Sequence, residues 1–251
     1  YIDFFDIDAR CKKSMLKNKL MLPFFGKPAD ELVKNKEIQL VLRSTGLKLK
    51  YYETEYPVSY PGYANVFSQR NNKHIPEEVS RLLKTANQNN IPNRQFSALF
   101  KKYTNTPSVK TYVDSCLDEV NNSSGEMLTF LSRLYYRPAF WKETNECINY
   151  RRFFTVNGLI CLNMQNKKVF DTYHSKIFSL INEGKFNGLR IDHIDGLFDA
   201  NLYVRTLRER TGKKAYQCVE KILEENENIP KNWPIEGTTG YDFLVVVNNL
   251  L

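Results

Sequence analysis

The sequence predicts an α/β fold, in which a helix-rich first part (residues 1–148) precedes a second part (149–251) built on parallel strands. Two observations predict it. A strand, a helix and a second strand follow one another within about 35 residues of the second part, which is the pattern of a βαβ unit with a right-handed crossover. The first part shows no such alternation. The 251 residues, 42% apolar and 25% charged, suffice to bury a core.

The first part reads as short helices and loops. The apolar residues of 30–42 have helical spacing, and Asp30 is a suitable capping residue at the start, so a helix is expected there. Residues 51–66 alternate and then enter a loop rich in proline and tyrosine. A short helix is expected over 76–90, and two helices over 108–134, broken between Asn121 and Gly125.

The second part reads as two helices and two strands. Residues 167–184 predict an amphipathic helix that stops at Gly184, and 197–212 predict another that stops at Gly212. Strands are expected within 186–192 and 214–223, one before and one after the second helix.

A carboxylate ends each predicted strand. Asp192 ends the first and Glu220 the second, so adjacent parallel strands would bring both to the same edge of the sheet. Two close carboxyls suit a retaining glycosidic reaction, with one as nucleophile and the other as acid and base. Arg190, two residues before Asp192, lies on the same strand face and could hold it ionised. Alternatively, both acids are ordinary charges at strand ends.

Composition argues against several classes of function. The net charge is +8, but the lysines are scattered, so no nucleic-acid surface is expected. No apolar run approaches the ~18 residues of a membrane span. Five cysteines without a C-x-x-C pair argue against a zinc site or disulfides and favour free thiols in a reducing cytoplasm. The start at Tyr1 and the apolar end at Leu251 suggest an internal piece of a longer protein.

A family resemblance rests on three motifs: "FNGLRIDHIDGL", "CVEKIL" and "WPIEGTTGYDF". With "YIDFFDID", "LMLPFFGKPADELVKNKEIQL", "LKLKYYETEYPVS" and "INYRRFFTVNGL", in the same order, they resemble maltooligosyltrehalose synthases of the α-amylase superfamily, glycoside hydrolase family 13. The resemblance covers most of the chain and is weak over residues 62–125. The block "LYYRPAFW" and Gly158 depart from the usual pattern.

The resemblance implies roles for eight residues. Asp192 falls on the nucleophile and Glu220 on the general acid/base. The other positions are expected to bind substrate: Arg190, His193, Lys221, Asp195, Arg152 and Tyr150. Asp195 stands where many amylases have lysine, which fits the trehalose-forming branch.

The implied activity is that of a (1→4)-α-D-glucan 1-α-D-glucosylmutase. Such an enzyme converts the reducing-end α-1,4 bond of a maltooligosaccharide into an α,α-1,1 bond, without a metal or organic cofactor. The alternatives are another glucan hydrolase or transferase of the superfamily, or a non-catalytic carbohydrate-binding fragment. The sequence does not indicate an oligomeric state.

The implied fold is part of a (β/α)8 barrel, with its fourth and fifth strands in residues 149–251. Residues 1–148 would be a largely α-helical insertion between the third strand and third helix. A third catalytic aspartate is expected beyond Leu251, and an early barrel motif before Tyr1. The chain alone is therefore expected to be inactive.

Overall fold

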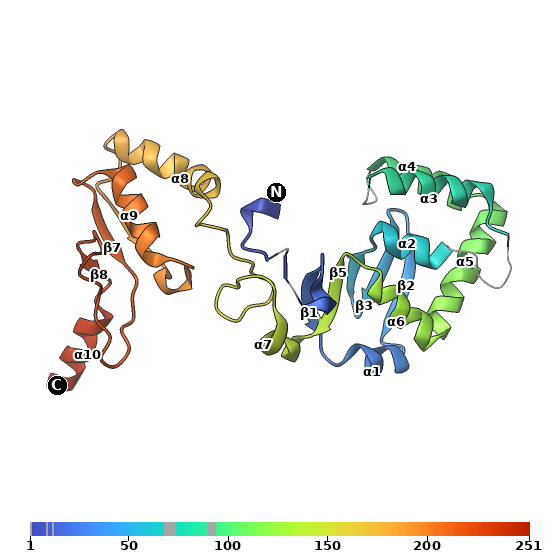
Figure 1. The fold of residues 1–251 in the computed structure, drawn as a ribbon, viewed down its shortest axis with the longest axis horizontal. Helices are drawn as coiled ribbons and strands as arrows, with labels where there is room; N and C mark the ends of the chain where they lie inside the picture. The colour runs from blue at the N-terminus through green and yellow to red at the C-terminus, as the bar shows by residue number, and fades with distance from the viewer. Residues whose placement is uncertain (1, 9, 12, 68–73, 90–93) are drawn as a thin grey trace. The chain divides into compact units, whose positions relative to one another are not determined.

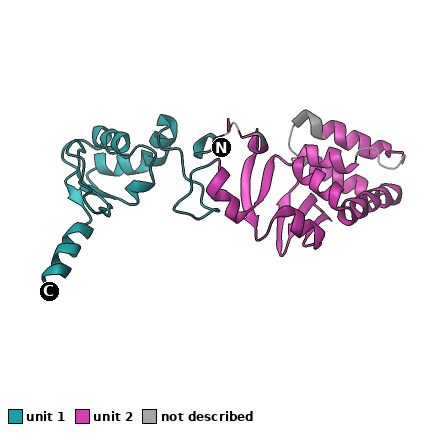
Figure 2. Ribbon diagram, turned by 60° about the horizontal axis from the view of Figure 1, so that its bottom comes forward, with its two compact units in different colours: residues 1–7, 150–251 teal, residues 8–149 magenta. Residues whose placement is uncertain are grey.

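Two compact units make up the chain (Figure 2): unit 1 comprises Tyr1–Ile7 with Tyr150–Leu251, and unit 2 comprises Asp8–Asn149. The computed structural model describes residues 2–8, 10–11, 13–67, 74–89 and 94–251. Each unit is considered by itself.

Unit 2 contains two small sheets (Figure 1). In the first, β1 (Leu20–Phe25) pairs in parallel with β5 (Tyr136–Phe140). The second is antiparallel in the order β2 (Ile38–Arg43), β3 (Gly46–Tyr51), β4 (Thr54–Pro57). This part of the chain is thus mixed helix and sheet, richer in strands than the sequence predicted.

The helix expected over residues 30–42 is wrong in its second half. The helix α1 (Ala29–Lys34) ends early, because Lys36 adopts a positive φ of 55° and turns the chain into β2. Within β2, Ile38 and Leu40 are buried while Gln39 between them is exposed. Apolar residues at positions i and i+4 fit a helix, but alternate burial is the pattern of a strand.

The remaining helices of unit 2 are α2 (Tyr60–Phe67), α3 (Glu77–Asn89), α4 (Arg94–Thr104), α5 (Pro107–Asn122), α6 (Ser124–Ser132) and the short α7 (Thr144–Cys147). The longer ones, α2 to α6, share one apolar core, in which α4 and α5 contact the antiparallel sheet, whereas Cys147 of α7 packs in a separate small cluster with Leu16 and Met21. The helix expected from Pro76 is confirmed through Asn89; Asn90 lies outside the described residues. The expected break between two helices is also confirmed, at Ser123, whose hydroxyl accepts the N–H of Glu126 at 3.3 Å.

Unit 1 holds a parallel sheet in the order β6 (Gly188–Ile191), β7 (Tyr216–Val219), β8 (Gly237–Thr238). The predicted strand–helix–strand unit is confirmed, since β6 and β7 are parallel with Ile191 opposite Val219. The strand β8 was not predicted. Across the described residues the sheet therefore has three strands, and it does not close into a barrel.

The helices of unit 1 begin and end where the sequence indicates. Asn166 caps α8 (Lys167–Asn182), and Asp199 caps α9 (Ala200–Thr211) by accepting the N–H of Leu202 at 2.8 Å. Gly184 and Gly212 follow them with φ of 69° and 76°, a conformation that favours glycine. The last helix is α10 (Tyr241–Leu250).

His174 joins α8 to α9. It is buried, and its Nδ1 lies 2.8 Å from the carbonyl oxygen of Phe170, so Nδ1 carries the proton. Its Nε2 therefore accepts the hydroxyl of Tyr203 at 2.8 Å. Burial lowers the pKa of His174, which favours this neutral form. His174 is thus a packing residue.

The first residues of the chain belong with unit 1. Isolated bridges pair Phe5 with Leu162 and Ile7 with Tyr150. Residues 1–7 thus lie outside the unit that follows them, which differs from the expected division at residue 148.

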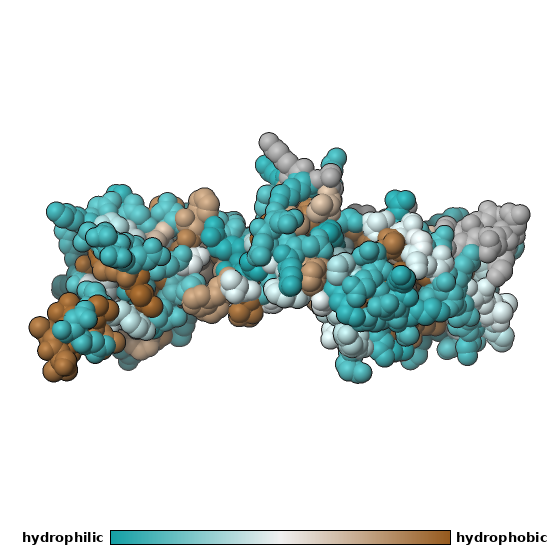
Figure 3. Space-filling model, turned by 90° about the horizontal axis from the view of Figure 1, so that it is seen from below, coloured by the Kyte–Doolittle hydropathy of each residue, from teal (hydrophilic) through white to brown (hydrophobic). Residues whose placement is uncertain are grey.

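The helix α10 is apolar over most of its surface. Five of its apolar side chains are more than half exposed, and they gather as a brown patch in Figure 3: Phe243, Leu244, Val245, Val246 and Leu250. None of the helices in the described ranges combines the length and apolarity needed to cross a membrane.

Candidate active site

The ends of β6 and β7 position the two predicted carboxylates. Because Ile191 pairs with Val219, the residues that follow, Asp192 and Glu220, leave the sheet at the same edge. The N–H of Glu220 donates to the carbonyl oxygen of Ile191 at 2.7 Å, which extends the ladder by one residue. The parallel register thus places both acids at the carboxyl edge, where barrel enzymes carry their chemistry.

Arg190 contacts both acids. Its Nη1 donates to Oδ1 of Asp192 at 2.5 Å, and its Nη2 lies 3.4 Å from Oε1 of Glu220. The hydrogen bond to Asp192 is the main cause that raises the pKa of Arg190. One guanidinium thus offsets part of the charge of two neighbouring carboxylates and fixes their separation.

His193 orients Glu220 through its backbone. It adopts a left-handed conformation, with φ 52° and ψ 46°, and its N–H donates to Oε2 of Glu220 at 2.7 Å. The His193 ring centroid lies 4.7 Å from that of Phe153 and 4.1 Å from that of Phe154. A Cβ at position 196 would lie 2.2 Å from this ring, so Gly196 is required there. Strained backbone of this kind is often found at functional sites.

Lys221 is buried between two loops rather than directed to Asp192. Its Nζ lies 2.9 Å from Oδ1 of Asp195 and 2.7 Å from Oε1 of Glu227. Burial acts to lower the pKa of Lys221, but the hydrogen bonds to Glu227 and Asp195 outweigh it and raise that pKa. Lys221 and Asp195 thus tie together the loops that follow β7 and β6.

Tyr150 and Arg152 face a neighbouring loop. The Tyr150 hydroxyl donates to the carbonyl oxygen of Asn157 at 2.8 Å, and Nη1 of Arg152 donates to Oδ1 of Asn157 at 2.6 Å. Neither residue lines the cavity beside Asp192. The structure therefore gathers Arg190, Asp192, His193 and Glu220, and does not bring Tyr150 or Arg152 to them.

A cavity of about 290 Å³ opens beside Asp192, within unit 1. Its lining includes Asp6, Arg151, Phe153, Asp192, His193 and Phe198. Arg151 and Asp6 were not predicted as site residues. Alternation along an extended segment puts Arg151 and Arg152 on opposite faces, but it does not by itself say which of the two faces the site.

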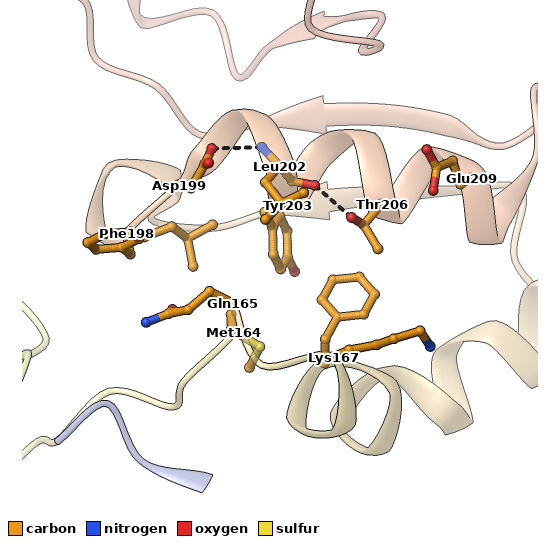
Figure 4. A pocket seen from close by; sticks show the side chains of 11 residues that line it. Met164, Gln165, Lys167, Phe198, Asp199, Leu202, Tyr203, Thr206 and Glu209 are labelled. Atoms are coloured by element: carbon orange, nitrogen blue, oxygen red, sulfur yellow. Dashed lines mark hydrogen bonds between the residues drawn. The ribbon is translucent and has the colours of Figure 1, made fainter. Parts of the chain in front are cut away.

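A second cavity, of about 310 Å³, adjoins the first and shares Met164, Gln165, Leu197 and Phe198 with it. Figure 4 shows it between α9 and the segment that enters α8, with the Tyr203 ring in its wall. It lies outside the carboxylate cluster.

Known proteins give consistent matches. No family model matches the chain. A protein of Mycobacterium tuberculosis, provisionally named maltooligosyl trehalose synthase, is 38% identical over 119 residues, which are 47% of this chain and 15% of that protein. The chain thus spans about one-seventh of the length of the curated relatives it matches.

Solved structures extend the match to the whole chain. The maltooligosyltrehalose synthase from Arthrobacter ramosus is 28% identical with a TM-score of 0.59, over 100% of this chain and 24% of that one. A glycosyltrehalose synthase, DSM5389, is 29% identical with a TM-score of 0.56, over 99% of this chain and 26% of that one. The motif resemblance is therefore confirmed: in sequence and in fold, the chain is similar to a segment of the much longer maltooligosyltrehalose synthases.

Proposed function

We propose that the protein containing this chain rearranges the reducing end of maltooligosaccharides, converting the last α-1,4 bond into an α,α-1,1 bond. The observation that carries the proposal is the contact of one guanidinium, that of Arg190, with the two carboxylates of Asp192 and Glu220. The similarity to named synthases supports the same reaction. On this proposal β6 and β7 are the fourth and fifth strands of a barrel, and β8 is the next strand.

The reaction proceeds in two displacements. The Asp192 carboxylate attacks the anomeric carbon, the bond to the reducing-end glucose breaks, and Glu220 gives its proton to the departing oxygen. The glucose turns within the site. Its anomeric hydroxyl then attacks the same carbon, Glu220 takes back the proton, and Asp192 is released. Two inversions leave the configuration retained.

The contacts on Glu220 suit this exchange. Its Oε2 accepts the N–H of His193, and its Oε1 faces Arg190 at 3.4 Å, which is too long for a strong hydrogen bond. Oε1 is thus the oxygen that can exchange a proton with the sugar. Asp192, bonded to Arg190 at 2.5 Å, is held as the nucleophile.

Replacement of each acid in the full-length protein tests the proposal. Asp192→Asn and Glu220→Gln should each lower the formation of a non-reducing product from maltopentaose by about 10³-fold or more. Asp171→Asn serves as the control, because Asp171 pairs with Lys167 and Arg210 on the helices. Survival of the activity in Asp192→Asn would disprove the assignment of the nucleophile.

A further inference from the structure

Three extended segments meet beside Asp192. The N–H of Arg151 donates to the carbonyl oxygen of Asp6 at 2.9 Å, and the N–H of Asp6 donates to that of Cys161 at 2.8 Å. The N–H of Cys161 in turn donates to the carbonyl oxygen of Arg151 at 2.9 Å. This closed ring of backbone hydrogen bonds fixes the positions of Asp6 and Arg151, although 145 residues separate them in sequence.

The guanidinium of Arg151 is held on one edge and one face. Its Nε donates to Oδ2 of Asp6 at 3.0 Å, and its central carbon lies 5.4 Å from the ring centroid of Phe198. Within the described residues, its Nη1 and Nη2 make no hydrogen bond. A guanidinium has five N–H donors, so four remain for a ligand. Arg151 lines the cavity that also contains Asp192 and His193.

The cavity suits one sugar ring. Its volume of about 290 Å³ lies near the lower end of ligand pockets, which hold roughly 300–1,000 Å³. Its walls combine apolar faces, including Phe153 and Phe198, with the charged fork of Arg151. A hexose likewise presents apolar C–H faces and a rim of hydroxyls, so the two surfaces are complementary.

We propose that Arg151, oriented by Asp6 and Phe198, hydrogen-bonds the reducing-end glucose after its bond is broken and keeps it in the cavity for the second displacement. This inference rests on the proposed function. The glycosyl group on Asp192 can pass either to the anomeric hydroxyl of that glucose or to water. Each route forms a new bond at the anomeric carbon, releases Asp192 and delivers one proton to Glu220. Retention of the glucose by Arg151 favours transfer over hydrolysis.

The test is the ratio of free glucose to trehalose-ended product formed from maltopentaose by the full-length protein. Arg151→Met should raise this ratio by about tenfold or more, because a hydrogen bond from a charged donor is lost. Arg151→Lys keeps a charge near Asp6 but lacks the planar fork, so its ratio should lie in between. If Arg151→Met does not fold, Arg151→Lys decides.

Arg210→Met is the matched control. Arg210 lies 3.6 Å from Oδ1 of Asp171 and 5.1 Å from the ring centroid of Phe178, so it has the same two kinds of contact away from the cavity. Its ratio should equal that of the wild type. An unchanged ratio in folded Arg151 variants would overturn the role of Arg151 and leave the proposed function standing. A wild-type protein that makes no trehalose-ended product would overturn both.

Discussion

Replacement of Arg208 by methionine should loosen the sheet edge that carries β8. Arg208 lies near the end of α9, and its side chain is only 13% exposed. Its Nε donates to the carbonyl oxygen of Pro234 at 2.9 Å, and its Nη1 donates to that of Ala215 at 2.6 Å. Its Nη2 lies 2.8 and 2.7 Å from the two carboxylate oxygens of Glu236. One side chain thus fixes the segments before β7 and β8.

The expected loss follows from these contacts. Each hydrogen bond to a backbone carbonyl contributes about 1 kcal/mol, and the pair with the part-exposed Glu236 adds about 1 kcal/mol. The total is about 3 kcal/mol, which corresponds to roughly 100-fold faster opening of this edge. Burial opposes the shift, but the N–H of Gln217 and the charge of Arg208 lower the pKa of Glu236. The stabilisation from the Arg208–Glu236 pair is therefore present above the ordinary pKa of a glutamate and is lost as the pH falls through the lowered pKa of Glu236.

Hydrogen exchange at neutral pH measures the opening. The informative amides belong to Glu236, bonded to the carbonyl oxygen of Gln217, and to Thr239, bonded to that of Val219. Arg205→Met is the control, since Arg205 is exposed on the same helix and its side chain forms no hydrogen bond or ion pair within the described residues. Exchange that stays within threefold of the wild type in Arg208→Met would refute the reasoning.

Two further predictions concern buried polar groups. Lys221→Met should flatten the pH dependence of the free energy of unfolding. Lys221 lowers the pKa of Glu227, so their pair stabilises the fold above the ordinary glutamate pKa of about 4.5, and the raised pKa of Lys221 makes the pair stabilise it below about 10.5. Urea unfolding should therefore show a smaller loss of stability at both pH extremes in the variant than in the wild type, although the N–H of Glu224 still lowers the pKa of Glu227 in both. Asn149→Ala should lower the free energy of unfolding of unit 2 by about 2–3 kcal/mol, because its buried amide accepts the N–H of Met21 at 3.0 Å and donates to the carbonyl oxygen of Lys19 at 2.8 Å. A melting temperature equal to that of the wild type would contradict this.

The sequence predicted best where local chemistry decides the structure. The helices α8 and α9 begin at side-chain caps and end before glycines with positive φ, and these signals are local. The two carboxylates were found because each directly follows a short apolar segment that the sequence identifies as a strand. Their shared contact with Arg190 depends on register, which became visible only with the pairing of β6 and β7.

The misses depend on contacts between distant segments. Two residues, Gly237 and Thr238, form β8 because β7 offers them a backbone partner. The apolar residues of β2 fit a helix or a strand until β3 pairs with them. Arg151 and Arg152 are equivalent by composition, and only the pairing of residues 5–7 with 150–152 decides which of them faces the cavity.

The chain leaves unit 1 between residues 7 and 8 and returns to it between residues 149 and 150, and this arrangement has a consequence for folding. Ile7 bridges Tyr150 in unit 1, and in unit 2 the N–H of Asp8 donates to the carbonyl oxygen of Asn149 at 2.8 Å. Folding of unit 2 alone therefore brings the two ends of its own segment together. Closure of a disordered connection of about 140 residues, rather than one of a few residues, would cost roughly 3 kcal/mol more in chain entropy. Once unit 2 has folded, this entropy cost no longer applies to the assembly of unit 1. Residues 8–149, which separate the two segments of unit 1, then connect those segments as closely as a short turn would.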